Sequence, residues 1–442
     1  MKEKIRIGSG AGFAGDRLDP AVILAEKGAL DYLVLECLAE RTIALANQRK
    51  LHNPNLGYDL LLERRMELLL PYLVKNNITL ITNMGAANPL AAAQKVQALA
   101  AEKGYKIRIA AVEGDDVLAE ISERKQDLEV VETGERLSHY SLVSANAYMG
   151  VEGILQALQA KAQIIITGRV ADPSLFLAPM IFEFEWSLAD YARLGAGTAI
   201  GHLLECAGQL TGGYFADGGK KNIQNLAEIG HPYADVHSNG EAVFGKVKDT
   251  GGEITLATVK EQLLYEVLNP SAYLTPDVVA NFMNIELAEI GKDQIKLRGA
   301  SGTERPELLK VSVGYKAGYV GEGEISYAGG QALARAELAG DIIKQRLAGK
   351  CSSIRVDIIG WDSVHRKNFR PDYEPYEVRL RIAAKANSLQ EAQLVGEEVE
   401  ALYTNGPAGG GGVRKYAQEQ IGIVSVLLPR TQCVDKISML MS

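Results

Sequence analysis

Paired cysteines, excess positive charge and long apolar runs are all missing from this sequence. Its four cysteines, Cys37, Cys206, Cys351 and Cys433, are far apart and include no Cys-x-x-Cys pair, so neither a disulfide framework nor a structural zinc site is expected. No apolar stretch approaches the roughly 20 residues that a membrane-spanning helix needs. The amino terminus leads into a strand-like run and not into a signal peptide. We therefore expect a cytoplasmic protein without a membrane partner.

Negative charge exceeds positive charge over the whole chain. The 442 residues include 47 lysines and arginines against 55 aspartates and glutamates, a formal net charge of -8. Nucleic-acid binding depends on clustered basic residues, and no such cluster with interleaved aromatic residues is present. We therefore expect no nucleic-acid partner. We also predict a small-molecule ligand and a homo-oligomeric assembly.

Short apolar segments alternate with helical patterns over the first half of the chain. Residues 32–35, 78–81 and 164–167 are nearly continuous apolar runs, typical of parallel strands covered on both faces. The expected elements are strands at 4–8, 31–36, 78–82, 106–112 and 163–167, and helices at 20–28, 59–75, 88–103 and 150–161, with less regular pieces near 116–122 and 139–144. This alternation predicts an α/β fold with a doubly wound, mostly parallel sheet.

The pattern changes near residue 217, where the segment ADGGKKN is typical of a linker. Expected strands follow at 236–246, 296–298, 309–319, 322–327, 353–359, 377–383 and 421–427, with helices at 257–268, 331–347 and 389–404. Two strands, a helix, two strands, a helix and a final strand are typical of an α+β domain. We therefore predict two domains, an α/β domain at 1–217 and an α+β domain at 218–442.

Glycine is abundant, with 45 residues, about a tenth of the chain against a usual ~7%. Residues 10–15, GAGFAG, follow a strand pattern with the spacing of a dinucleotide-binding fingerprint, and Glu36 lies where a ribose-binding carboxylate would. In dinucleotide folds, however, the glycines themselves open the helix. Here the strongest helix start is the later pair Asp19-Pro20, with aspartate as N-cap. Nicotinamide binding is therefore retained only as an alternative.

Three strand-to-helix corners share one design. The segments GSGAGFAGDRLDP, TNMGAANP and TGRVADP, at 8–20, 82–89 and 167–173, each pass from a strand through a glycine-containing loop to an Asx-Pro pair. In open parallel sheets, ligands bind beyond the carboxyl ends of the strands, where helix N-termini favour anions. The three corners therefore predict one binding site for a carboxylate or phosphate group.

Polar side chains on these corners have candidate roles. We expect Asp16 and Asp172 to act as a catalytic base or as ligands of a divalent metal, and Arg169 to hold a substrate carboxylate or phosphate. The other predicted anion-binding residues of the corners are Gly10, Gly12, Arg17, Asn83 and Asn88, and further acidic groups are Glu36, Glu113 and Asp115. In the alternative interpretation, Asp19, Asn88 and Asp172 serve only as helix caps.

A helical pattern from residue 201 carries His202, Glu205 and Cys206 at spacings of three and four residues, which places them on one face. We predict that His202 and Glu205 form a catalytic acid–base pair. A metal site and a half-buried structural histidine are the alternatives. Nothing in the sequence indicates a lowered thiol pKa for Cys206, so a nucleophilic cysteine is not favoured.

A second glycine-rich loop, NGPAGGGGVRK, occupies residues 405–415. It lacks the Gly-Lys-Ser/Thr ending of a phosphate-binding P-loop, but free backbone N–H groups beside an arginine favour an anion nest. We therefore include Gly410, Gly411 and Arg414 among the predicted anion-binding residues. A mobile surface loop is the alternative.

Together, several segments resemble the acyclic terpene utilisation (AtuA-type) family. GAGFAGDR, DYLVLECLAERT, ITNMGAANP, TGRVADPSLFLAP, HLLECAGQLTGGYF, TVKEQLLYEVLNPSAYLTPDV and GPAGGGG occur in the family's order and spacing, over about residues 5 to 430. The chain resembles the shorter members, which lack an additional small C-terminal domain. Named members are encoded with enzymes that degrade acyclic terpenoids through coenzyme A thioesters, so the resemblance implies acyl-CoA or branched-acid catabolism.

The residues and the resemblance favour a lyase or hydratase that moves a proton or water beside the carbonyl of a carboxylic acid or acyl-CoA. Coenzyme A would then be part of the substrate, and a divalent metal is a further candidate cofactor. A second hypothesis is a non-catalytic subunit that presents an acyl-CoA to a carboxylase or hydratase partner. A third, based on the opening glycines alone, is a nicotinamide-dependent oxidoreductase.

Overall fold

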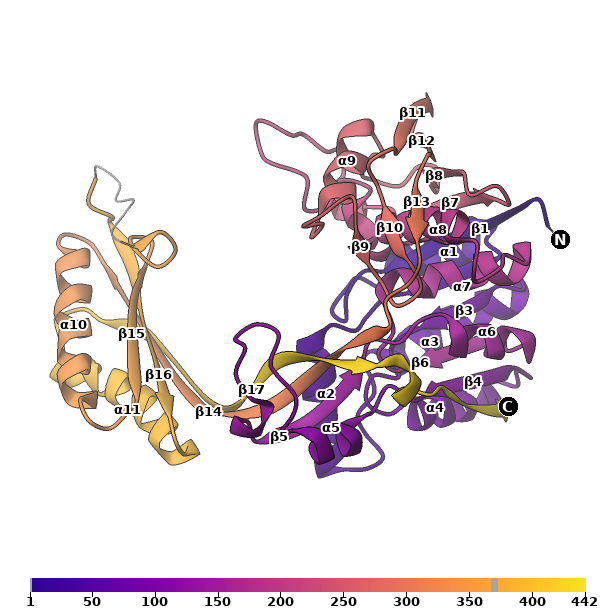
Figure 1. Cartoon of the computed structure of the whole chain (residues 1–442). Coiled ribbons are helices and arrows are strands. Elements are labelled where there is room, and N and C mark those ends of the chain that lie inside the picture. The colour runs from indigo at the N-terminus through magenta and orange to yellow at the C-terminus, as the bar shows by residue number, and fades with distance from the viewer. Residues whose placement is uncertain (1, 367–372) are drawn as a thin grey trace. The chain divides into compact units, whose positions relative to one another are not determined.

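The computed structural model describes residues 2–366 and 373–442 and divides the chain into two compact units (Figure 1). The larger unit contains Met1–Gly314 and Ile423–Ser442, and the smaller unit contains Tyr315–Gly422. The chain passes between them within two long strands, β14 (Leu308–Ala328) and β17 (Gly411–Pro429). None of the helices that these described residues form is long and apolar enough to cross a membrane.

A ten-stranded mixed sheet forms the centre of the larger unit. Its middle strands are parallel and follow the order β1 (Lys4–Ala11), β2 (Tyr32–Leu35), β3 (Thr79–Thr82), β6 (Ile164–Thr167) and β4 (Arg108–Glu113). Leu33, Leu80 and Ile164 are neighbours across three of these strands, and all are buried. Burial on both faces of the sheet explains the continuous apolar runs. Each strand predicted in the first half is present.

Antiparallel strands extend this sheet at both ends. Beside β1 lie β7 (Pro232–His237), β8 (Ala242–Lys246), β12 (Gln294–Arg298) and β11 (Glu286–Gly291), and beside β4 lies β18 (Lys436–Met441). The segment predicted as one strand at 236–246 contains the turn between β7 and β8. Because β7 pairs directly with β1, residues beyond 217 complete the first sheet and do not begin a new unit.

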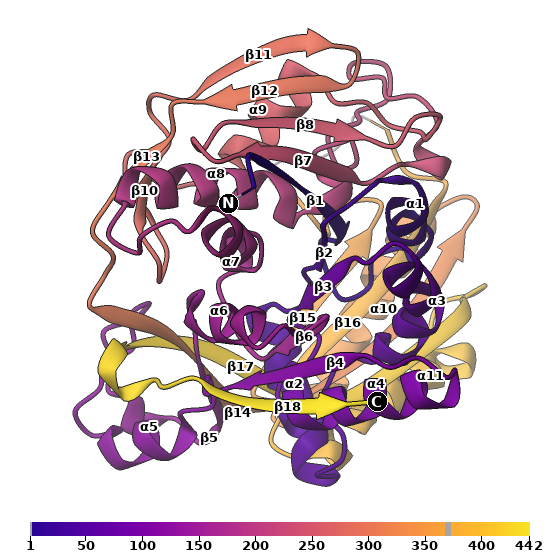
Figure 2. The same ribbon diagram turned by 90° about the vertical axis from the view of Figure 1, so that its right-hand side faces the viewer.

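Helices cover both faces of the parallel strands, so the predicted α/β class is confirmed (Figure 2). One face carries α1 (Asp19–Lys27), α3 (Leu62–Lys75) and α4 (Pro89–Glu102), and the other carries α6 (Glu152–Gln159), α7 (Asp172–Phe184) and α8 (Tyr191–Glu205). Leu24 of α1, Leu69 of α3 and Val96 of α4 belong to one buried core with the strands. This packing fixes the ends of the strands and the loops that follow them.

The remaining elements of the larger unit lie outside the ten-stranded sheet. They are α2 (Glu40–His52), α5 (Leu118–Arg124), β5 (Leu142–Ala147), α9 (Leu256–Leu264), β9 (Tyr273–Leu274), β10 (Val279–Asn281) and β13 (Ser301–Thr303). Helix α2 was not predicted, whereas the irregular piece expected at 139–144 includes the start of β5.

The smaller unit contains part of β14, α10 (Ala332–Leu347), β15 (Ser353–Ile359), β16 (Glu377–Ala386), α11 (Leu389–Asn405) and part of β17. Its sheet order, β15-β16-β14-β17, is that of a ferredoxin-like fold. Ile325, Leu380 and Val399 form its core with the two helices. The predicted α+β pattern is therefore present, and the strands expected at 309–319 and 322–327 are one long strand.

Asp19 and Asp172, expected as N-caps, are instead the first residues of their helices. Neither of these helices, α1 and α7, has a side-chain cap. Asn88 does cap α4, because its side-chain oxygen accepts a hydrogen bond from the N–H of Ala91 at 3.3 Å. Proline suits all three starts, since the N–H groups of a first turn have no helical partner.

The packing of α8 against β13 predicts the effect of one methyl group. A Cβ on Gly195 would lie 2.0 Å from the carbonyl oxygen of Ser301, so we expect Gly195→Ala to lower the free energy of unfolding by about 1–3 kcal/mol in urea denaturation. Gly218→Ala is the control, because a Cβ there meets nothing within 4 Å, and its effect should stay within about 0.5 kcal/mol. Equal stability of the two variants would contradict this packing.

Candidate functional site

A cleft of about 800 Å³ lies at the carboxyl ends of the parallel strands in the larger unit. Gly12 follows β1, Glu36 follows β2 and Arg169 follows β6, and all three line it. Glu205, at the end of α8, and His231, just before β7, also line it. The first and third of the predicted corners therefore meet in one cleft.

The first corner contributes Asp16 and Arg17. The Asp16 carboxylate accepts hydrogen bonds from the N–H groups of Gly12 at 2.9 Å and of Arg17 at 2.8 Å, which hold it in the loop. The Arg17 guanidinium donates to Asp19 at 3.1 and 2.6 Å and to the carbonyl of Ala227 at 2.5 Å. Arg17 is therefore engaged within the protein, and an anion at this position would compete with Asp19.

The glycines of this corner serve close packing. Gly10 lies within β1, and a Cβ there would be 2.6 Å from the side chain of Leu35. A Cβ on Gly12 would be 2.6 Å from the carbonyl carbon of Cys206. Since α1 begins only at Asp19, this corner does not form the geometry in which glycines open a dinucleotide-binding helix.

Glu36 is a buried acid of the cleft that two hydrogen bonds hold in place. Its Oε1 accepts hydrogen bonds from the N–H of Leu38 at 2.8 Å and from Nδ2 of Asn83 at 2.9 Å. Asn83 is itself fixed, because its Oδ1 accepts from the N–H of Cys37 at 2.7 Å. Burial and the neighbouring charge of Asp172 raise the pKa of Glu36 to about 8. At neutral pH this carboxyl group therefore holds a proton that it can donate.

The two asparagines of the second corner have different surroundings. Asn83 is fully buried and supports Glu36 from behind without lining the cleft. Asn88 donates from Nδ2 to the carbonyl oxygens of Pro54 and Leu56, both at 2.8 Å, in addition to capping α4. The second corner therefore does not line the cleft: Asn83 supports it indirectly through its hydrogen bond to Glu36, and Asn88 lies outside it.

Arg169 and Asp172 form the third corner. The Arg169 side chain is only 3% exposed, and its Nη1 donates to Oδ1 of Asp172 at 2.8 Å and to the carbonyl of Leu38 at 2.6 Å. Nη2 lies 3.7 Å from Oε1 of Glu40. The guanidinium stacks on Tyr148, 4.5 Å from the ring centre. Burial, opposed by Arg169, raises the pKa of Asp172. The arginine charge is therefore already shared between carboxylates.

A buried network fixes the backbone of this corner. The N–H of Arg169 donates to Oδ2 of Asp115 at 2.9 Å, and Nδ2 of Asn146 donates to the same oxygen at 2.8 Å. Asn47 supports Asn146 in turn through a 2.9 Å hydrogen bond. A Cβ on Gly168 would lie 2.2 Å from the Asp115 carboxylate, so only glycine fits there. Burial raises the pKa of Asp115 to about 6.

His202 and Glu205 are hydrogen-bonded, with 2.8 Å between Nδ1 and Oε1. Glu205 lines the cleft, whereas His202 lies behind it, 1% exposed and packed against the rings of Tyr273 and Phe282. Burial, opposed by His202, raises the pKa of Glu205 to about 7, and its Oε2 has no hydrogen-bond partner among the residues that the structure describes. Burial also raises the pKa of Cys206. The glutamate is thus the member of the pair that faces a ligand.

His231 lines the cleft and was not predicted. It is 2% exposed, and its Nε2 lies 4.0 Å from Oδ1 of Asp16. Burial lowers the pKa of His231, which favours the neutral imidazole at neutral pH. Tyr265 and Glu266, which follow α9, also line the cleft. No local pattern marks His231, because its carboxylate partner is more than two hundred residues away in the chain.

The glycine-rich segment at 405–415 belongs to the smaller unit and includes the end of α11, a short loop and the start of β17, so Gly411 and Arg414 lie on a strand and not in a loop as predicted. Its predicted anion-binding residues Gly410, Gly411 and Arg414 are not among those that line the cleft. Arg335, on α10, donates a hydrogen bond to the carbonyl of Ala408 in the loop at 2.8 Å. This contact gives the loop a partner inside its own unit.

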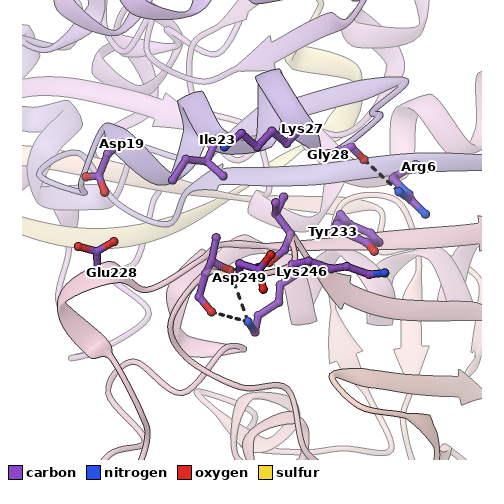
Figure 3. A pocket seen from close by; sticks show the side chains of 12 residues that line it. Arg6, Asp19, Ile23, Lys27, Gly28, Glu228, Tyr233, Lys246 and Asp249 are labelled. Carbon is purple, nitrogen blue, oxygen red and sulfur yellow. Dashed lines mark hydrogen bonds between the residues drawn. The ribbon is translucent and has the colours of Figure 1, made fainter.

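A second pocket, of about 610 Å³, lies beside α1 and the loop after β8 (Figure 3). Its two most buried cations already have partners. Arg6 donates to Asp235 at 2.8 Å and to the carbonyl of Gly28 at 3.0 Å, and Lys246 donates to the carbonyl of Thr250 at 2.8 Å. These contacts tie the sheet to its loops, so we place the candidate functional site in the larger cleft.

Acidic groups outnumber basic groups in the cleft. The carboxylates are Asp16, Glu36, Glu40, Asp172, Glu205 and Glu266, and the basic side chains are Arg17, Arg169 and His231. Within residues 2–366 and 373–442, no group of three or more His, Cys, Asp or Glu side chains is arranged to hold a metal ion. Burial and neighbouring negative charges raise the pKa of Glu36 to about 8 and that of Glu205 to about 7, so these two groups retain protons near neutral pH.

Fold and cleft together define an α/β protein with a carboxylate-rich site at the carboxyl ends of its parallel strands. A family model described as "Acyclic terpene utilisation family protein AtuA" matches residues 5–439. The chain therefore belongs to the acyclic terpene utilisation family, as its motifs predicted. Comparisons with curated proteins and with solved structures found no match.

The raised pKa of Glu36 predicts a pH dependence of stability. In the folded protein the pKa of Glu36 is about 8, whereas an exposed glutamate of the unfolded chain has a pKa of about 4.3. Between these two pH values the folded chain holds a proton that the unfolded chain has released. The free energy of unfolding therefore decreases as pH rises through this range. Glu36→Gln keeps the acceptor oxygen but does not titrate. We expect the free energy of unfolding of Glu36→Gln, minus that of the native chain, to increase by about 1 kcal/mol or more from pH 5 to pH 8, as measured by urea denaturation.

Glu67→Gln is the matched control, because Glu67 is exposed on α3. Its stability relative to the native chain should vary little over the same pH range. A pH-independent difference between Glu36→Gln and the native chain would show that Glu36 is ionised throughout and would contradict the prediction.

Proposed function

We propose that the cleft is the active site of an acid–base enzyme of carboxylic-acid or acyl-CoA catabolism, of the lyase or hydratase type. The observation that carries this proposal is that two buried carboxyl groups with raised pKa values, about 8 for Glu36 and about 7 for Glu205, line the same cleft. General acid–base catalysis requires a proton donor and acceptor whose pKa values lie near the working pH. A cleft that served binding alone would not need them.

Arg169 is the group that binds the substrate anion in this proposal. Its Nη2 faces Glu40 at 3.7 Å, and Glu40 has a second partner, Lys310, at 3.1 Å. Glu40 is also 37% exposed. A substrate carboxylate therefore replaces Glu40 beside Nη2, while Asp172 keeps Nη1 in place through its 2.8 Å hydrogen bond.

Glu205 then acts as the base and Glu36 as the acid. Glu205 removes a proton from the carbon beside the carbonyl, and the electron pair of that C–H bond forms a carbon–carbon double bond. The C–O bond at the next carbon breaks, and its oxygen takes a proton from Glu36 and leaves as water. His202 stabilises the ionised Glu205 through their 2.8 Å hydrogen bond. Hydration is the same sequence in reverse.

Glutamine variants test these roles. The purified chain is assayed with 3-hydroxyacyl and enoyl thioesters of coenzyme A and with the free acids, and Glu36→Gln and Glu205→Gln are each expected to lower kcat by about 10²- to 10⁴-fold. Glu67→Gln, on the exposed face of α3, should leave kcat unchanged. Thermal unfolding shows that each variant is folded.

Two outcomes would reject the proposed enzyme. Turnover that is unchanged in both glutamine variants would remove Glu36 and Glu205 from the chemistry. Binding of an acyl-CoA without turnover by the native chain would support instead a non-catalytic subunit that presents the thioester to a carboxylase or hydratase.

A further inference from the structure

An apolar pocket of about 460 Å³ lies in the larger unit beside the cleft. Its walls include Leu274, Leu308 and Leu427, which are 68%, 44% and 45% exposed, together with Pro276 and Pro306. Leucines that are exposed singly need no explanation, but several around one pocket mark a binding surface. No part of the acid–base chemistry proposed above uses this pocket.

The wall between the apolar pocket and the cleft is thin. Tyr148 lines both, and its hydroxyl donates to Asp172 at 3.3 Å. On β9, Tyr273 lines the cleft and the next residue, Leu274, lines the apolar pocket. Neighbouring residues of a strand point to opposite sides, so one strand and one tyrosine ring separate the two spaces.

The two spaces also meet at an exposed rim. Glu40 lines the cleft and Lys310 lines the apolar pocket, and their side chains form an ion pair at 3.1 Å. These side chains are 37% and 46% exposed, so the rim lies at the surface. A ligand that extends from one space into the other can therefore pass over this ion pair without displacing the half-buried Tyr148.

We propose that the apolar pocket binds the hydrocarbon chain of the same substrate whose carboxyl or thioester group occupies the cleft. This inference rests on the proposed function of the cleft. It assigns the substrate class as acids or thioesters with an extended apolar chain. The contacts on both sides of the Glu40–Lys310 rim support a single ligand, because its polar end would meet Arg169 and its apolar end the leucines.

Binding of two carboxylates that differ only in chain length tests the pocket. We expect the full-length chain to bind decanoate much more tightly than butanoate in calorimetric titrations, by about fourfold for each methylene group that the pocket covers. Leu274→Ser and Leu427→Ser should each weaken decanoate binding about three- to tenfold and leave butanoate binding unchanged. Equal affinities for the two acids, or unchanged decanoate binding in both variants, would overturn the proposal.

Leu268→Ser is the matched control. Leu268 is fully exposed and lines neither space, so its substitution should not change the affinity for decanoate. An equal loss of decanoate affinity in this variant would show that the effect comes from general surface hydrophobicity and would overturn the proposal.

A charge variant separates one shared ligand from an independent lipid site. Glu40→Gln removes the internal carboxylate that competes for Arg169, so we expect it to tighten decanoate binding about threefold or more. Unchanged binding would place the chain in a site unconnected to the cleft and would overturn the proposal. Chain-length selectivity does not depend on turnover and should persist in Glu205→Gln, so failure of the pocket and failure of the proposed enzyme are distinguishable.

Discussion

The buried guanidinium of Arg169 is the interaction on which the cleft depends. It brings one positive charge beside Asp172 and Glu40, donates to the carbonyl of Leu38 and stacks on Tyr148. Removing one partner of a buried ion pair leaves an uncompensated charge and costs more than the pair itself contributes. Arg169 therefore allows several carboxyl groups to lie together at the ends of the strands.

Burial, together with carboxylates that Arg169 does not neutralise, sets the proton content of the cleft. Glu36 and Glu205 are buried with raised pKa values, each next to a fixed polar partner, Asn83 or His202. An anionic ligand at Arg169 would add negative charge and favour further the protonated form of Glu36, the proposed acid. In the proposed enzyme, the same electrostatic field would therefore couple substrate binding to proton transfer.

Much of the fold was predictable, because the signals are local. Apolar runs such as residues 164–167 predicted the parallel strands, and the Asx-Pro pairs predicted helix starts within one residue. The spacing of His202 and Glu205 predicted their contact on one helix. The boundary between the two units could not be predicted from local patterns. The strand β7 pairs with β1, far away in the chain, and such long-range hydrogen bonds leave no signal in the neighbouring sequence.

The sequence by itself determined the alternation of strands and helices, the three corners and the family. Only the tertiary structure decided which polar side chains share a cleft: it joined Glu36, Arg169 and Glu205, added His231, and left Asn88 and the loop at 405–415 outside. The physical reason is that helix and strand periodicity act between neighbours in the chain. Burial, pKa values and shared charge arise instead from side chains that meet only after the sheet has assembled.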